Sequence, residues 1–159
     1  MRIDYLENHR DKIATLAAWH HGEWQHLYSD WTLKIATAEL ADHATRRSLP
    51  TTLVLLDGDT LLGSVSVVHE DAAELRDRGG PWLASLYVDP EARGQGLGQA
   101  LVEAAAHLAA LNDVPRLLLF TPGHEDFYTQ LGWQTIEQAQ LNGHAVAIMS
   151  LVPVLAAAE

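Results

Sequence analysis

The sequence predicts a single α+β domain covering residues 1–159, with a mixed, mostly antiparallel sheet of six to seven strands and about four helices. Two observations predict its centre. The apolar run Leu83–Val88 leads through closely spaced glycines into Leu97–Leu111, whose apolar residues have helical spacing. A second apolar run, Arg116–Phe120, follows, as in a right-handed parallel crossover. A third observation concerns the segments on either side of this centre: they read as short strands around tight turns, which indicates antiparallel hairpins.

Before this centre, the chain reads as one strand, two helices and a hairpin. Apolar residues fall on one side of Asp11–Leu27, which predicts the first helix, and Thr32 can cap a second helix that runs to about Thr45. The strand before these helices is expected at Ile3–Leu6. After them, the two hairpin strands are expected at Thr51–Leu56 and Thr60–His69, and a charged loop at Glu70–Pro81.

After the centre, the chain reads as a short helix and a final hairpin. Thr121-Pro122-Gly123 ends the strand before this region because proline has no N–H for a sheet ladder. The predicted segments are His124–Leu131 for the helix, Trp133–Glu137 and Ala145–Val152 for the hairpin strands, and Ala156–Glu159 for a frayed tail.

Composition limits the class of protein. The chain is 48% hydrophobic but has no apolar run of membrane-spanning length, and Met1-Arg2-Ile3-Asp4 begins no signal-peptide core. We therefore expect a cytoplasmic protein that does not contact membranes. With no cysteine, the chain cannot form disulfides, thiolate metal sites or a cysteine acyl-enzyme.

The charge balance is strongly acidic. The chain has 21 Asp and Glu against 10 Lys and Arg, for a net charge of −11. Nucleic-acid binding needs a concentrated basic surface, so we expect no nucleic-acid partner. A negative field would steer a cationic substrate inward, although solubility alone also explains an acidic chain.

The turn Arg93-Gly94-Gln95-Gly96-Leu97-Gly98 opens the central helix. Each glycine costs about 1 kcal/mol against alanine inside a helix, so three of them at one helix start need an explanation. Glycine lets the backbone approach a ligand closely, and the first N–H groups of a helix attract phosphate. Arg93 adds a cation. The turn thus indicates a phosphate or pyrophosphate site, with a tight strand-to-helix connection as the simpler alternative.

Two motifs together resemble the GCN5-related N-acetyltransferase (GNAT) superfamily. Arg93 to Gly98 is similar to its acetyl-CoA signature, and Tyr128-Thr129-Gln130-Leu131-Gly132-Trp133 is similar to its late Tyr–Gly–aromatic element. The resemblance extends from about Thr51 onward. It implies a GNAT-type sheet whose fourth and fifth strands splay apart. It also implies an acetyl-CoA-dependent enzyme that moves an acetyl group to a primary amine by direct attack in a ternary complex.

The resemblance also implies site residues. Tyr128 corresponds to the tyrosine that often protonates the departing thiolate. Many relatives carry a basic glutamate on the fourth strand, but Ala84 and Ser85 stand here, which leaves Glu70, His69, His124 and Glu125 as candidates for the base. Main-chain groups on the strand and the glycine turn would bind acetyl-CoA, at Leu86, Tyr87, Val88, Arg93, Gly94, Gln95, Gly96, Leu97 and Gly98.

The missing glutamate keeps an alternative open, a non-catalytic acyl-CoA sensor or regulatory module. A nucleotide-binding module is a weaker alternative because the Walker lysine is absent. We expect no metal, since His20-His21 with Glu23 lacks the His-Glu-x-x-His spacing. The expected partner is a small-molecule or peptide amine, and a homodimer is left open.

Overall fold

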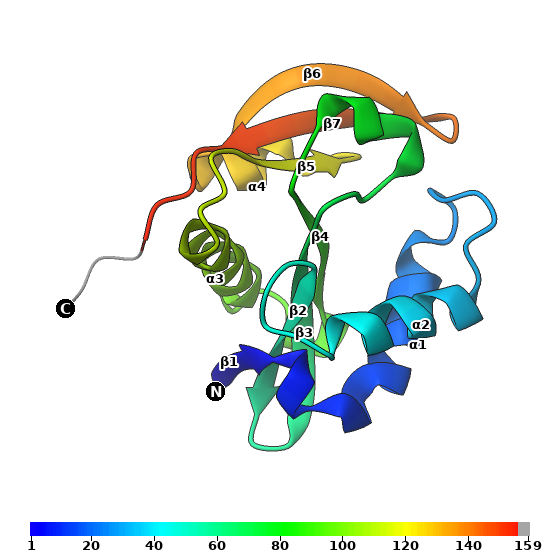
Figure 1. Cartoon of the computed structure of the whole chain (residues 1–159), viewed down its shortest axis with the longest axis vertical. Helices are drawn as coiled ribbons and strands as arrows, with labels where there is room; N and C mark the ends of the chain where they lie inside the picture. Colours follow the sequence, from blue (N-terminus) through cyan, green and yellow to red (C-terminus); the bar gives the residue numbers. More distant parts are fainter. Residues whose placement is uncertain (156–159) are drawn as a thin grey trace.

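The computed structural model describes residues 1–155, so the tail predicted at Ala156–Glu159 lies outside the described residues. In these residues, seven strands form one sheet in the order β1-β2-β3-β4-β5-β7-β6, and every neighbouring pair except β4–β5 is antiparallel (Figure 1). This confirms the predicted fold class. The strands are β1 Arg2–Tyr5, β2 Thr51–Asp57, β3 Thr60–Val68, β4 Trp82–Val88, β5 Leu117–Thr121, β6 Gln134–Leu141 and β7 His144–Leu151.

Four α-helices cover the two faces of the sheet within residues 1–155. Helices α3 and α4 lie on one face, and α1 and α2 lie on the other (Figure 1). The helices are α1 Ile13–Trp24, α2 Leu33–His43, α3 Leu97–Leu111 and α4 Glu125–Gln130, with 3₁₀ turns that include Ala73–Arg78 and Pro90–Ala92.

Side-chain alternation along the strands divides the core between these faces. On β2, Leu53 and Leu55 pack toward α3, whereas Val54 and Leu56 pack toward α1 and α2. Because successive strand residues point to opposite faces, this continuous apolar strand supplies both cores.

Several elements begin or end at other residues than the sequence predicts. Helix α1 is shorter than expected because a separate 3₁₀ turn, Arg10–Lys12, precedes it. The Thr32 cap is confirmed, since its Oγ1 accepts a hydrogen bond from the Ile35 N–H at 3.1 Å. Strand β6 runs to Leu141 rather than Glu137, because its polar residues continue the antiparallel ladder with β7. Leu111, expected on the inner face of α3, is 56% exposed.

The parallel pair β4–β5 is joined at one point. Its only paired residues are Trp82 and Leu118, while β5 pairs with β7 along its whole length. One further bond, from the Leu118 N–H to the Pro81 carbonyl at 3.0 Å, lies at the same end. The two strands therefore separate toward their C-terminal ends, which confirms the splayed pair that the resemblance implied.

Candidate active site

A cleft of about 620 Å³ opens where β4 and β5 separate. Its walls include Leu83–Val88 on β4 and Leu119–Thr121 on β5, which are the residues beyond the single paired position. Leu83 and Leu119 belong to the core on the α3 side, whereas Ala84 and Phe120 contact the core on the opposite face. The cleft thus passes between the strands and connects the two faces of the sheet.

The start of α3 forms one end of this cleft. Gly94 and Gly96 have φ of +81° and +78°, a left-handed conformation that strains any residue with a Cβ. Within residues 1–155, the amides of Gly94 to Gln99 donate no hydrogen bond; the Ala100 N–H donates to the Gly96 carbonyl. These amides lie at the positive end of the helix dipole, so this end can bind an anion.

Arg93 is fixed at the mouth of the cleft. Its Nε donates to the Val88 carbonyl at 2.9 Å, and its guanidinium lies 5.6 Å from the centre of the Tyr87 ring. Among the cleft-lining residues, all within the part of the chain that the structure describes, Arg93 is the only Lys or Arg. The positive charge is therefore concentrated at the glycine turn. Of the predicted residues in this turn, only Gln95 does not line the cleft.

The wall formed by β4 contains a bulge. Ser64 and Ser66 on β3 pair with Tyr87 and Ala84, so β4 has one more residue than β3 in this interval, and Ser85 has φ of +55°. A bulge leaves main-chain groups out of the regular ladder. The bulge overlaps the start of Leu86–Val88, the part of β4 that is predicted to bind the cofactor through its backbone.

A buried histidine supports the bulge from α1. His20 Nε2 lies 2.8 Å from Ser64 Oγ, and the Ser64 hydroxyl donates to the Ser85 carbonyl at 3.3 Å. Burial lowers the pKa of His20 to about 4, with a smaller contribution from His43, so the ring is neutral at pH 7. The sequence showed only that His20 lies on the apolar side of a helix.

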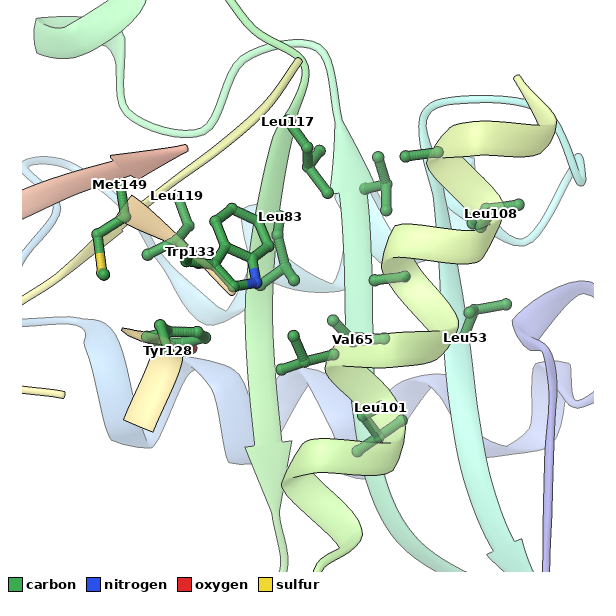
Figure 2. Packing of buried hydrophobic residues seen from close by; sticks show 14 of the residues in the cluster. Leu53, Val65, Leu83, Leu101, Leu108, Leu117, Leu119, Tyr128, Trp133 and Met149 are labelled. Atoms are coloured by element: carbon green, nitrogen blue, oxygen red, sulfur yellow. The ribbon is translucent and has the colours of Figure 1, made fainter. Parts of the chain in front are cut away.

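Tyr128 lies on the α3 side of the gap. Its ring is buried against Phe127 and Trp133 at centroid distances of 5.0 and 6.1 Å, and Figure 2 shows it beside Leu119 and Trp133. Burial raises its pKa, so the phenol keeps its proton at neutral pH. Within residues 1–155 the hydroxyl has no hydrogen-bond partner, and the residue lines the cleft.

Of the four candidates for the base, the structure brings one into the cleft. His124 lines it, at the start of α4. Glu125 instead accepts a hydrogen bond from Thr135 Oγ1 at 3.0 Å, and Glu70 is exposed; neither lines the cleft. His69, next to Glu70, is exposed as well.

Sequence reasoning missed a tyrosine–aspartate pair in the cleft wall. The Tyr28 hydroxyl, from the chain after α1, donates to Asp71 Oδ1 at 2.8 Å. Burial raises the pKa of Asp71 to about 7, against the lowering effect of this hydrogen bond. The two residues are 43 positions apart, and Asp71 stands in a loop rich in charges, so no motif marked them.

The sequence profile of the acetyltransferase (GNAT) family matches residues 13–133, about three quarters of the chain. The chain belongs to the GNAT family. The resemblance to this family, which rested on the glycine turn and the Tyr128 element, is thereby confirmed. This GNAT chain is an acetyltransferase. No curated protein sequence matches it.

Solved structures share the GNAT fold of this chain. An aminoglycoside 6'-N-acetyltransferase complexed with coenzyme A superposes with a TM-score of 0.74 at 16% identity, covering 99% of this chain and 100% of the other. A Salmonella typhimurium protein solved with acetyl-CoA gives 0.72 at 15%, covering 100% and 97%. A ribosomal-protein-alanine N-acetyltransferase from Brucella melitensis gives 0.71 at 16%, covering 96% and 99%.

The described part of this GNAT chain shows neither a metal-ligand cluster nor a membrane-spanning helix. Over residues 1–155, no three His, Asp or Glu side chains are grouped as a metal site would require. None of the helices described is long and apolar enough to cross a membrane.

Proposed function

We propose that this GNAT domain transfers the acetyl group of acetyl-CoA to a primary amine by direct attack in a ternary complex. The observation that carries the proposal is the gap between β4 and β5, which opens beside the unpaired amides at the start of α3. An anion-binding turn and a cleft that crosses the sheet suit a long diphosphate ligand whose reactive end must reach an acceptor on the other face.

Acetyl-CoA would be held by main-chain groups. The amides after Arg93 suit its diphosphate, and the backbone at Leu86 to Val88 lies beside the gap where its pantetheine amides would pass. Two structural neighbours were solved with coenzyme A and with acetyl-CoA, which supports this assignment. The bound thioester supplies an activated acetyl group.

The acceptor amine attacks the thioester carbonyl carbon, and the C–S bond then breaks. Backbone N–H groups at the β4 bulge would stabilise the oxyanion, an effect of about 3–4 kcal/mol for one donor in other enzymes. Tyr128 then donates its phenolic proton to the departing thiolate. A phenol with a raised pKa remains protonated until it is needed, which suits this role.

Two measurements on the purified protein test the proposal. Acetyl-CoA should raise its melting temperature, while ATP should not. Release of free CoA should be detectable with at least one member of a panel of spermidine, kanamycin, amino acids and short peptides with free N-termini. Stabilisation by ATP alone would refute it. Acetyl-CoA binding without turnover on any amine would instead favour the sensor alternative.

The glycine turn gives a sharper prediction. Replacing Gly96 with valine should remove most of the acetyl-CoA-induced shift in melting temperature, because a β-branched residue cannot keep φ of +78° and the amides would turn away. Gly58→Val is the matched control, since Gly58 has φ of +58° and open space around it in the β2–β3 hairpin. Both variants should lose stability, but a full acetyl-CoA shift in Gly96→Val would contradict the assignment.

A further inference from the structure

We infer that the Asp71 carboxylate, held by Tyr28 in the wall of the cleft, binds the acceptor as a primary ammonium ion and accepts its first proton. The inference rests on the acetyl transfer proposed above. It names the base that the sequence did not show and the charge state in which the acceptor arrives.

The Tyr28–Asp71 pair and Tyr128 lie on opposite faces of the sheet. Tyr28 and Ala72, the neighbour of Asp71, pack in the core with Ala84 and Phe120, on the face opposite α3. Tyr128 packs in the other core, with Leu83 and Leu119 (Figure 2). The cleft joins the two faces, so an amine entering past Asp71 meets the thioester from one face while the thiolate leaves toward Tyr128 on the other.

The hydrogen bond that Asp71 accepts comes from an uncharged group. Within residues 1–155, Asp71 has no ion pair, and its hydrogen-bond partner is the neutral phenol of Tyr28. Burial and the acid groups nearby raise the pKa of Tyr28, so it remains a donor to the carboxylate. A desolvated carboxylate without a cation, facing an open cleft, is stabilised by a cationic ligand.

The groups around Asp71 favour the same kind of ligand. Glu39 on α2 raises its pKa, Glu74 in the following 3₁₀ turn acts on Tyr28, and Glu23 and His26 line the same cleft. Among the lining residues, all within 1–155, the only Lys or Arg is Arg93, and it lies at the glycine turn. This end of the cleft therefore carries negative charge, in contrast to the turn.

Aromatic side chains complete the site. Trp24, Tyr28 and Phe120 line the cleft, and the Tyr28 and Phe120 rings are 6.3 Å apart. Rings of this kind attract cations through their faces. They would bind the carbon skeleton next to the ammonium group, so the predicted acceptor is a primary amine on an apolar or aromatic carbon skeleton.

The proton balance closes without another reactant. Asp71 takes one proton from the ammonium, which frees the nitrogen lone pair to form the C–N bond. As the tetrahedral intermediate collapses and the C–S bond breaks, the nitrogen loses a second proton to solvent, and the thiolate takes one from Tyr128. Tyr128 then regains a proton from solvent and Asp71 releases its own proton to solvent, so both residues are restored and the net products are amide, thiol and one proton.

Asp71→Asn tests the inference, because an asparagine oxygen can still accept from Tyr28 and preserve the fold. We expect kcat for the best amine of the panel to fall about 100-fold, the range typical of lost general base catalysis. The fall of kcat/KM below about pH 7 should also disappear, because Asp71 has a pKa of about 7. Asp59→Asn, the same change in the exposed β2–β3 turn, is the matched control and should behave as wild type.

Tyr28→Phe separates a base from a merely structural residue. Its hydrogen bond lowers the pKa of Asp71, so its removal should move the acidic limb of the kcat/KM profile to higher pH. Benzyltrimethylammonium, a cation that cannot lose a proton, reports binding alone. At pH 8.5, it should bind about tenfold more weakly to Asp71→Asn than to wild type by calorimetry.

The outcomes are distinguishable. Asp71→Asn with unchanged kcat and an unchanged acidic limb would overturn the inference, as would loss of that limb in Glu70→Gln or His124→Asn instead. The acetyl-CoA-induced thermal shift should remain in Asp71→Asn. A wild-type protein that shows no such shift would overturn the proposed function itself.

Discussion

Tyr128→Phe should lower kcat for acetyl transfer by about 100-fold or more while leaving acetyl-CoA binding nearly unchanged. Removal of a general acid typically costs 10²- to 10⁴-fold, because the thiolate must then leave without its proton. The hydroxyl has no partner within residues 1–155, so its loss breaks no internal hydrogen bond, and the ring keeps its contacts with Phe127 and Trp133. Single-turnover rates and acetyl-CoA thermal shifts provide the two readouts.

Tyr5→Phe is the control for this prediction. Tyr5 lies on β1 beneath Arg47 and does not line the cleft, and the change removes the same atom. It should leave kcat at the wild-type value. If Tyr128→Phe reduced kcat and acetyl-CoA binding to the same small extent, Tyr128 would be a packing residue rather than the acid.

Acidification should destabilise the folded protein through His20. Its pKa is about 4 in the folded chain, against 6.5 for a free histidine, so the unfolded state binds more protons between these values. The contribution to stability is therefore present above pH 6.5 and is lost as the pH falls toward 4. A pKa difference of this size corresponds to about 3 kcal/mol.

Urea unfolding of wild type and His20→Gln at pH 7 and pH 4 measures this effect. Glutamine can still bond Ser64 but does not titrate, so the variant should lose about 3 kcal/mol less than wild type over this interval. Asp and Glu titrations are common to both proteins and cancel in the difference. Parallel losses of free energy in the two proteins would contradict the assignment of this titration to His20.

Local pattern predicted the elements of this fold well. The bounds of α3 agree with its apolar spacing, and the Thr32 cap is where the hydroxyl predicts it. The failures involve tertiary contacts. Leu111 is exposed because the face of α3 that packs on the sheet includes Ala105 and Ala109 instead. The spacing of apolar residues along the helix could not show that these alanines, rather than Leu111, face the core.

The site was predicted unevenly for a physical reason. The glycine turn is local, so its spacing alone indicated an anion site. The proposed acceptor side is formed by residues distant in sequence, such as Tyr28 and Asp71, which the packing of the chain after α1 against the β3–β4 loop brings together. Glu70, beside Asp71, was proposed because sequence cannot show which neighbour in a loop points inward.

The single contact between β4 and β5 also bears on aggregation. Strand edges that lack a hydrogen-bonded neighbour can pair with a strand of another molecule. In this sheet, β4 and β5 have two such edges, which face each other beyond Trp82 and Leu118. Both lie in the interior of the strand order and line the cleft, rather than forming an outer edge of the sheet. Amide and carbonyl groups of these strands can therefore remain unpaired inside the molecule without adding an outer edge at which another copy could pair.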